Sequence, residues 1–299
     1  MKVSHHPDYY LPLPEGHPFP MAKYTLVYDV LRAQGLLDAG NIMLPEEIAR
    51  EDLARVHTED YLDRLFAAGL TAMEVRRLGV PWSPRLLRRS RLAVAGTVLA
   101  LEAALIEGLA GNLAGGTHHA FADHGEGFCV LNDVAVAIRK AQHAGRLQRA
   151  LIIDLDVHQG NGTASIFEAD DRVFTFSMHG ERNYPAQKMR SSLDIGLPDG
   201  VGDDEYLQRL QDALPQLLRG FSPEVIFYLA GVDVMAGDRY GRFKLTEQGL
   251  RERERRVLDF ASAKGLPLVI TLAGGYASDA ARTARLHAVV FEEAALRRA

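Results

Sequence analysis

From residue 112 onward, short apolar runs alternate with stretches of helical spacing, and this alternation constrains the fold more than any other feature of the chain. The apolar runs span residues 112–115, 149–154, 173–177, 224–230 and 266–272. Between and after them, residues 130–143, 161–168, 203–219, 246–264 and 278–298 have the spacing of helices. Continuous apolar strands joined by helical crossovers are typical of a parallel sheet that is buried on both faces. The sequence therefore predicts an α/β fold, a doubly wound and mainly parallel sheet with helices on both faces.

The first 110 residues have a different pattern, with apolar positions three and four residues apart and Gly or Pro at the ends of segments. Helices are predicted there over residues 21–35, 59–69 and 84–108. A group of prolines predicts a loop at the start of the chain: Pro7, Pro12, Pro14, Pro18 and Pro20. No repeat, low-complexity segment or linker divides the sequence. We therefore expect residues 1–299 to form a single domain.

Composition excludes several classes of protein. With 47% hydrophobic and 24% charged residues, the chain is neither disordered, collagen-like nor a membrane protein. The net charge of −5 and the lack of a basic block give no reason to expect a nucleic-acid partner, whereas a slightly acidic surface is compatible with a cationic substrate. A single cysteine, Cys129, cannot form an intramolecular disulfide. With no apolar leader or span, the sequence predicts a cytoplasmic protein without a membrane partner.

Polar side chains with catalytic or metal-binding potential follow the predicted strands. These side chains belong to His118, His119, Asp156, His158, Asp233 and Tyr276. In an open parallel sheet, the loops at the carboxyl ends of the strands converge and form the binding site. We therefore expect these residues to meet at one edge of the sheet.

The segment at residues 154–163 carries Asp154, Asp156 and His158 at alternating positions. In an extended chain these side chains would project to one side, with roughly 6–7 Å between successive members. Asp156 and His158 could then share a metal ion with Asp233 from a neighbouring strand. Two aspartates and one histidine leave a coordination position open for water, which indicates a catalytic metal site. The alternative is that these residues only cap strand ends and helix starts.

Adjacent histidines usually lie in surface loops, and we expect this of His5 and His6. His118 and His119 have a different context, because they follow Gly115 and Gly116. Glycines permit backbone conformations and close approaches that other residues do not. We interpret His118 and His119 as a functional pair.

Taken together, the motifs of this chain resemble those of the zinc-dependent histone deacetylase family, whose fold is shared with arginases, and the similarity is strongest to class IV. The matching segments occur in the family's order between about residues 17 and 290: residues 56–62, 115–119, 127–129, 154–163, 197–207, 233–241 and 274–276. No single segment decides the resemblance, but the ordered set is specific.

The resemblance implies a role for each motif residue. Asp156, His158 and Asp233 resemble the zinc ligands of the family. The catalytic group would comprise His118 and His119 as general acid and base, Tyr276 as the hydroxyl that stabilises the oxyanion, and Asp154 and Asn161 as the partners that orient the histidines. This set suits amide hydrolysis, since an amide must be polarised by a metal and its oxyanion stabilised by a preorganised donor.

Asn161 departs from the commoner family pattern, in which an aspartate orients the second histidine. Class IV members resemble this chain at that position. An amide carries no charge with which to raise the pKa of a histidine. We therefore hypothesise that His119, beside Asn161, stays neutral and accepts the proton of the water, while His118, beside Asp154, is more basic.

The resemblance also implies a substrate channel and a potassium ion. Gly127, Phe128 and Tyr184 resemble the lining of a narrow acyl-lysine channel, although the two aromatic residues could instead pack in the core. The potassium ligands would be main-chain oxygens and one hydroxyl, contributed by Asp154, Asp156, His158, Met178 and Ser177. Cys129 could be reactive, but a buried and inert thiol is the simpler interpretation.

The sequence thus predicts a metal-dependent amidohydrolase that removes an acetyl or longer acyl group from an N-acyl lysine of a peptide or protein, or from an acylpolyamine. Its metal would be one Zn²⁺ per chain, or Fe²⁺ or Co²⁺, because two carboxylates and an imidazole accept all three. One alternative is an arginase-like hydrolase with two manganese ions, for which Asp238 lies at an unsuitable spacing after Asp233. The other is a catalytically inactive protein that binds acyl-lysine.

Overall fold

A single parallel sheet forms the centre of the protein. The structure is a computed structural model that describes residues 1–297. Within this range, eight strands form one sheet in the order β2-β1-β3-β8-β7-β4-β5-β6, and every neighbouring pair is parallel. The strands are β1 (Lys2–Ser4), β2 (Ile42–Met43), β3 (Leu109–Asn112), β4 (Ala150–Asp154), β5 (Val173–Gly180), β6 (Leu193–Leu197), β7 (Val225–Leu229) and β8 (Leu268–Thr271).

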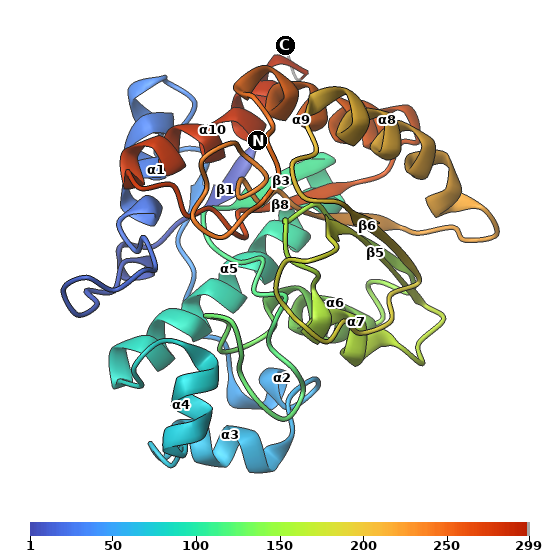
Figure 1. The fold of residues 1–299 in the computed structure, drawn as a ribbon. Coiled ribbons are helices and arrows are strands. Elements are labelled where there is room, and N and C mark those ends of the chain that lie inside the picture. Colours follow the sequence, from blue (N-terminus) through green and yellow to red (C-terminus); the bar gives the residue numbers. More distant parts are fainter. Residues whose placement is uncertain (298–299) are drawn as a thin grey trace.

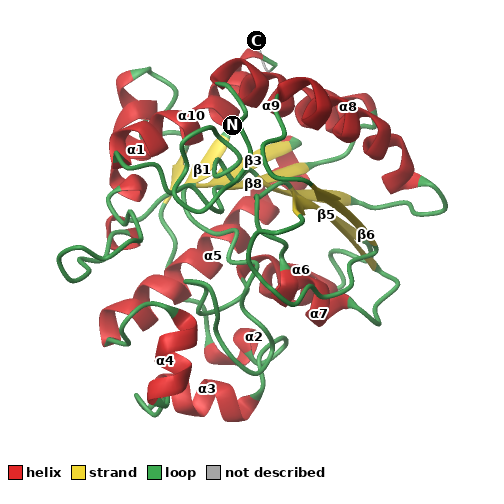
Figure 2. Ribbon diagram, in the orientation of Figure 1, coloured by secondary structure: helices red, strands yellow, loops and turns green. Residues whose placement is uncertain are grey.

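Helices cover both faces of this sheet, as the sequence predicts. One layer contains α1 (Lys23–Ala33), α8 (Asp203–Ala213), α9 (Glu247–Ala263) and α10 (Ala280–Leu296), and the opposite layer contains α5 (Pro84–Glu107), α6 (Asp133–His143) and α7 (Asn161–Phe167) (Figures 1 and 2). Three short helices lie beyond α5, namely α2 (Arg50–Leu53), α3 (Glu59–Phe66) and α4 (Ala72–Leu78). Two 3-10 helices, Pro7–Tyr9 and Leu214–Leu218, complete the helical segments of the described chain.

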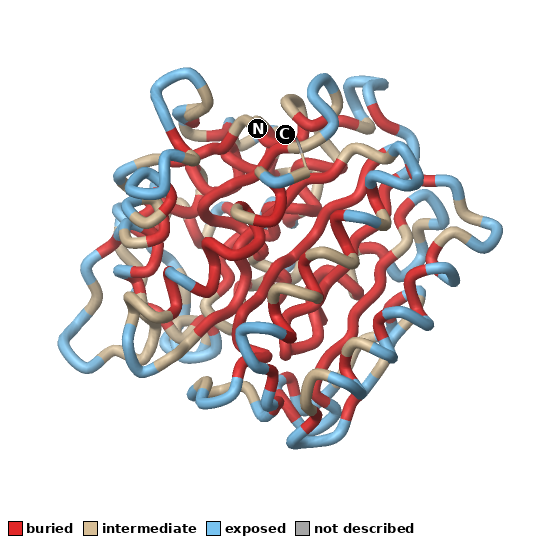
Figure 3. Tube along the Cα trace, turned by 90° about the horizontal axis from the view of Figure 1, so that it is seen from above, coloured by how far each residue is buried: buried red, intermediate tan, exposed pale blue. Residues whose placement is uncertain are grey.

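The core lies on both sides of the central strands. Every residue of β4 and β7 is buried, which explains why their sequences are continuous apolar runs rather than alternating ones. In the view from above, buried chain fills the interior and exposed residues lie in loops and on outer helix faces (Figure 3). Several helices begin at side-chain caps: Ser83 caps α5, Asn132 caps α6 and Thr246 caps α9. The caps of α5, α6 and α9 thus lie at the starts of segments that the apolar periodicity also predicts to be helical.

The structure differs from the sequence-based boundaries mainly at the edges of the sheet. Strands β1, β2 and β6 were not predicted; they are short or only partly buried, so they lack the continuous apolar signal. The strand expected at residues 112–115 lies instead at Leu109–Asn112, because Gly115 and Gly116 have φ angles of +77° and +72°. The predicted last helix starts later, at Ala280, and its predicted end at residue 298 lies outside the described residues.

The connections place four loops at one edge of the sheet. Strands β3, β8, β7 and β4 are adjacent in the sheet although they are distant in sequence. The loops that follow them carry the polar residues singled out above. Such a reversal of strand order opens a crevice at the carboxyl ends of the strands. In the part of the chain that the structure describes, no helix is long and apolar enough to cross a membrane.

The packing of α10 on the sheet requires a glycine in β3. A Cβ atom added to Gly111 would lie 2.6 Å from the Phe291 ring, which is fully buried. We expect Gly111→Ala to lower the free energy of unfolding by about 1–3 kcal/mol, the cost of overpacking a dense core. Denaturant unfolding measures this. The second substitution Phe291→Leu should recover part of the loss, and a double variant that is simply the sum of two losses would contradict the assignment.

Candidate active site

The loop after β4 is built from tight turns rather than from extended chain. The strand ends at Asp154, and residues 156–158 form a bend. The backbone amide of Asp156 donates to the Asp154 carboxylate (3.1 Å), and that of His158 donates to Asp156 (2.9 Å). The predicted extended run from Asp154 to His158 is therefore wrong beyond Asp154. The turns direct the Asp154 side chain toward His118. They direct the side chains of Asp156 and His158 toward Asp233.

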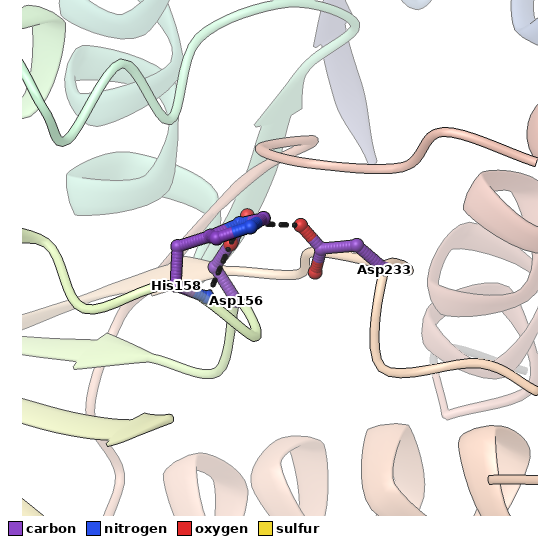
Figure 4. A group of neighbouring side chains, drawn as sticks. All are labelled: Asp156, His158 and Asp233. Carbon is purple, nitrogen blue, oxygen red and sulfur yellow. Dashed lines mark hydrogen bonds and ion pairs between the residues drawn. The ribbon is translucent and has the colours of Figure 1, made fainter. Parts of the chain in front are cut away.

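Asp156, His158 and Asp233 form a buried group that could hold a metal ion. One ligand atom from each lies within 4.8 Å of the other two. His158 Nδ1 is 2.9 Å from Asp156 Oδ1 and 3.1 Å from Asp233 Oδ2, so the imidazole faces both carboxylates (Figure 4). Asp156 and His158 come from the loop after β4, and Asp233 comes from the loop after β7. The structure thus brings together the three residues predicted as ligands.

Backbone amides fix the other oxygen of each carboxylate. Gly274 N donates to Asp156 Oδ2 (2.6 Å), and Val157 N donates to Asp233 Oδ1 (2.9 Å). Position 274 must be glycine, because an added Cβ would lie 2.0 Å from Asp233 Oδ2 and 2.5 Å from Asp156 Oδ2. The second oxygen of each carboxylate, Asp156 Oδ1 and Asp233 Oδ2, is thereby turned toward His158 in a fixed orientation. This is the arrangement that a preformed metal site requires.

The electrostatics of the group favour a cation at its centre. Burial and the nearby Asp156 raise the pKa of Asp233 to about 7. Burial opposes the charged form of His158 as well, but the two carboxylates outweigh it and raise the pKa of His158 to about 10. The imidazolium then balances part of the buried negative charge. A divalent cation would displace this proton, since metal binding and ligand deprotonation are coupled.

His118 and His119 lie beside the metal group, and each has a different partner. Their ring centroids are 4.1 Å apart. His118 Nδ1 donates to Asp154 Oδ2 at 2.7 Å, and His119 Nδ1 donates to Asn161 Oδ1 at 2.7 Å. Asn161 is the first residue of α7. In both histidines the second ring nitrogen, Nε2, is left for chemistry in the site.

The different partners separate the two histidines electrostatically. Burial lowers the pKa of His118, but the carboxylates of Asp154 and Asp156 outweigh it and raise the pKa to about 9. Burial, together with the charges of His118 and His158, lowers the pKa of His119 well below its usual range. These directions are the ones hypothesised from the sequence. The surroundings of His118 therefore favour its protonated form, and those of His119 favour its neutral form.

Tyr276 is held at the site by Asp238, whose role was not recognised from the sequence. Asp238 Oδ2 accepts from the Tyr276 amide (2.7 Å), while Oδ1 accepts from the amides of Tyr240 (2.9 Å) and Gly241 (3.0 Å). The Tyr276 ring lies 6.3 Å from the His158 ring, centroid to centroid. Asp238 thus joins the loops after β7 and β8. The short Asp-x-x-Gly segment is a turn signal that could have indicated this.

A pocket of about 250 Å³ leads from the surface to the histidines. Its lining consists of Arg77, Gly79, His119, Gly127, Phe128, His158, Tyr184, Tyr240 and Tyr276. All three predicted channel residues are in this wall, and Tyr184 is 43% exposed, so it is not a core residue. Gly127 has a φ of +54°, and a Cβ there would lie 2.7 Å from the His119 ring. The pocket wall is therefore formed by rings on several loops and by Gly127, where a side chain would meet the His119 ring.

Comparison with known proteins identifies the family to which this chain belongs. A model of the family described as "Histone deacetylase domain" matches residues 17–291. The chain belongs to the histone deacetylase family. One relative, an uncharacterized protein of Picosynechococcus sp., is 47% identical to this chain over 297 residues. The match covers 99% of this chain and 97% of the relative. Histone deacetylase 2 of Arabidopsis thaliana is 36% identical, and the match covers 89% of this chain and 71% of that protein.

Solved structures of the family have the same fold. A crystal structure of a histone deacetylase (HDAC) homologue complexed with SAHA has a TM-score of 0.85 at 27% identity, covering 99% of this chain and 84% of that one. An HDAC homologue from Aquifex aeolicus has a TM-score of 0.82, also at 27% identity, with 98% and 84% coverage. The predicted family and the arginase/deacetylase-like fold are confirmed. As a member of this family, the protein is a hydrolase.

Ser177 and Met178, which were predicted to bind potassium, and Cys129 remain to be placed in this deacetylase family member. Ser177 and Met178 lie on β5, and Ser177 is in register with Asp154. The Ser177 hydroxyl is 3.0 Å from His179 Nδ1. The potassium site stays a prediction.

Burial raises the pKa of the Cys129 thiol. The thiol therefore stays protonated, which favours the interpretation that Cys129 is unreactive.

Two further carboxylates that support the site, Asp133 and Glu126, were also missed in the sequence. Asp133 accepts from the amides of Gly116 (3.1 Å) and Thr117 (2.8 Å), and so shapes the turn that precedes the histidine pair. Glu126 accepts from Asn161 Nδ2 at 2.7 Å. Asp133 also accepts from the hydroxyl groups of Thr97 and Thr117. Bonds of these kinds leave no spacing pattern in a sequence.

The anchoring of Tyr276 can be tested through stability. Asp238→Asn replaces the Oδ2 acceptor by an amide that cannot accept from the Tyr276 amide. We expect the free energy of unfolding to fall by about 1–3 kcal/mol, because a partly buried backbone donor is left unsatisfied. Denaturant unfolding at neutral pH measures the change. The exposed Asp171→Asn is the matched control, and an equal effect of the two substitutions would contradict the anchoring role.

Proposed function

We propose that the protein is a metal-dependent amidohydrolase that removes an acyl group, acetyl or longer, from an N-acyl lysine or an acylpolyamine. The observation that carries this proposal is the buried Asp156, His158 and Asp233 group beside a histidine pair, with His119 and His158 in the wall of a pocket. The family membership supports the reaction class. The pocket and its aromatic wall suit an aliphatic chain that ends in an amide.

Two carboxylates and one imidazole fit a single divalent cation, for which we propose Zn²⁺, with Fe²⁺ or Co²⁺ as substitutes. When bound, such a cation polarises the amide carbonyl and lowers the pKa of a water molecule. Asp156, His158 and Asp233 would hold it through the atoms that already face one another. For a structural K⁺, the proposed ligands are the main-chain oxygens on β4, its following loop and Met178, with the Ser177 hydroxyl.

The chain's own groups divide the proton transfers. His119 has its Nδ1 bonded to Asn161, so its neutral Nε2 can accept the proton of the attacking water. His118, bonded to Asp154, is positioned as the imidazolium that protonates the departing amine. The Tyr276 hydroxyl would donate to the developing oxyanion. Gly127, Phe128 and Tyr184 would hold the acyl-lysine chain and exclude water from it.

The arrangement favours one metal over an arginase-like pair. A two-metal site needs additional bridging carboxylates. Among the described residues, the metal-ligating cluster is the single group at Asp156, His158 and Asp233. Asp238 is engaged by three backbone amides, and position 161 is an amide. All proposed ligands and Tyr276 are present, which weighs against an inactive acyl-lysine binding protein.

We further propose that the protein belongs to class IV of the family, because position 161 is an asparagine. We also propose that it is located in the cytoplasm.

The metal and the substrate class can be tested together. Protein loaded with Zn²⁺ is expected to hydrolyse lysine peptides or polyamines that carry acyl groups of increasing length, with one metal equivalent per chain by elemental analysis. Asp233→Ala should abolish both the metal and the activity. Tyr276→Phe should retain the metal but lower kcat by about 10²–10³-fold, as expected for loss of an oxyanion donor. Two metal equivalents, or full activity of Tyr276→Phe, would contradict the proposal.

The histidine roles predict the dependence on pH. His118 is protonated below its raised pKa of about 9 and loses its proton above it, so kcat/KM is expected to fall on the alkaline side near or below that value. His119, with its lowered pKa, stays neutral through the same range. Asp154→Asn removes the charge that holds the proton on His118 and should move the alkaline limb to lower pH by about 1–3 units.

The two histidines should also differ when they are removed singly. His119→Ala is expected to lose about 10²–10⁴-fold in kcat, the usual contribution of a general base. His118→Ala should lose less and should no longer show the alkaline limb. Equal losses in both variants, with an unchanged limb in Asp154→Asn, would overturn the assignment.

A further inference from the structure

We propose that Glu126 is a positioning residue for the general base. Glu126 and Asn161 act as one unit that orients His119 as a single carboxylate would, with the hydrogen on Nδ1. This inference rests on the proposed function, since it concerns the same histidine. Glu126 lies in the loop that also carries the channel residues Gly127 and Phe128. It belongs neither to the metal group nor to the pocket lining. It interacts with Tyr184 of the lining, but the bond that leads from it to the histidine pair runs through Asn161.

A continuous chain of hydrogen bonds joins the three residues. Glu126 Oε1 accepts from Asn161 Nδ2 at 2.7 Å, and Asn161 Oδ1 accepts from His119 Nδ1 at 2.7 Å. Asn161 is 3% exposed and His119 is 5% exposed, so water does not compete for the bond between them, while the Glu126 side chain is 15% exposed. The amide of Asn161 thus has one end on the carboxylate and the other on the imidazole.

The chemistry of the partners fixes the direction of every bond. An ionised carboxylate can only accept, so Glu126 must face the NH₂ group of Asn161. The amide oxygen then faces His119, and it too can only accept. His119 Nδ1 must therefore carry a hydrogen, which leaves Nε2 as the free base in the site. Without Glu126, the Asn161 amide could rotate and present NH₂ to His119, which would reverse the tautomer.

The surroundings keep Glu126 ionised and in place. His124 Nε2 lies 3.6 Å from its Oε2, and the Tyr184 hydroxyl hydrogen-bonds to it. The backbone amide of Glu126 donates to Cys129 O (3.0 Å), and that of Phe128 donates to Leu78 O (2.7 Å), so the loop is docked on the end of α4. Burial opposes the charge, but the hydrogen bonds to the side chain hold the pKa of Glu126 at about 2. The side chain is therefore a fixed acceptor.

The pair also explains why position 161 carries an amide. An aspartate at this position would place a second carboxylate oxygen where Asn161 Nδ2 lies, 2.7 Å from Glu126. Two carboxylates this close cannot both be ionised. With Glu126 present, the amide transmits its negative charge toward His119 by polarisation along the chain of bonds. Glu126 and Asn161 are thus mutually dependent.

This dependence is tested by a double-mutant cycle in the metal-loaded enzyme. Glu126→Gln and Asn161→Asp should each lower kcat by about 10–100-fold with little change in KM, the usual effect of losing an outer-shell partner. The double variant should regain most of the loss, because the carboxylate introduced at position 161 can then accept both from His119 and from the amide introduced at position 126. Multiplicative losses in the double variant would overturn the proposal.

A control variant in the same loop separates this role from a general effect of charge. Asp123 lies 2.7 Å from His124 Nδ1 and is exposed. Asp123→Asn removes a carboxylate charge from the loop without touching the bonds between Glu126, Asn161 and His119, and it should leave kcat unchanged. A loss in Asp123→Asn as large as that in Glu126→Gln would mean that loop charge, rather than the hydrogen-bonded chain, governs the general base.

A second readout does not depend on activity. In long-range ¹H–¹⁵N spectra of histidine-labelled protein, His119, identified by its loss in His119→Ala, should show the tautomer protonated at Nδ1. Glu126→Ala should give a mixture of both tautomers, whereas Asp123→Asn should not. If the wild-type enzyme hydrolyses no acyl substrate, the proposed function fails, yet this spectrum still tests the role of Glu126. An unchanged His119 tautomer in Glu126→Ala would refute that role.

Discussion

The site depends on two carboxylates, Asp156 and Asp233, that are buried and face the same point. An isolated buried carboxylate is too costly to remain charged, so the fold must supply positive charge and donors around the pair. Backbone amides of Gly274 and Val157 satisfy the outer oxygens, and His158 faces the inner ones. The charge of Asp156 also reaches His118 and helps to raise its pKa.

The buried Arg253 on α9 extends this support below the site. Its guanidinium donates to the carbonyl oxygens of Leu155 (3.2 Å) and Gly231 (2.7 Å), and it pairs with Glu254. One side chain therefore ties the loop that carries Asp156 and His158 to the loop that carries Asp233. Rigid elements supply the precision that a site of this kind needs. The helical layer thus contributes to the geometry of the metal group without contacting it.

Sequence periodicity predicts the central strands because strands such as β4 and β7 are buried on both faces and are uniformly apolar. The strands β1 and β2, at one side of the sheet, are only three and two residues long, too short for such a signal. At the site, the residue types and their order indicated the ligands and the histidines. The shape of the loop after Asp154 was not predictable from alternation, because side chains there bond back to the backbone and bend the chain. Glu126 was missed because its bond to the Asn161 amide leaves no spacing pattern, whereas the turn signal at Asp238 does not reveal that its second oxygen accepts from the Tyr276 amide.

His118 and His119 show how partners rather than residue type assign chemical roles. The two imidazoles are adjacent and similarly buried, and both use Nδ1 to contact an oxygen at 2.7 Å. One oxygen belongs to a carboxylate and the other to an amide, and this difference helps to send the two pKa values in opposite directions. A carboxylate directly on His119 would accept from the same Nδ1 and so keep its orientation, but it would also raise the pKa of His119. In the fold, the charge of Glu126 lies one amide farther away, and the pKa of His119 stays below its usual range.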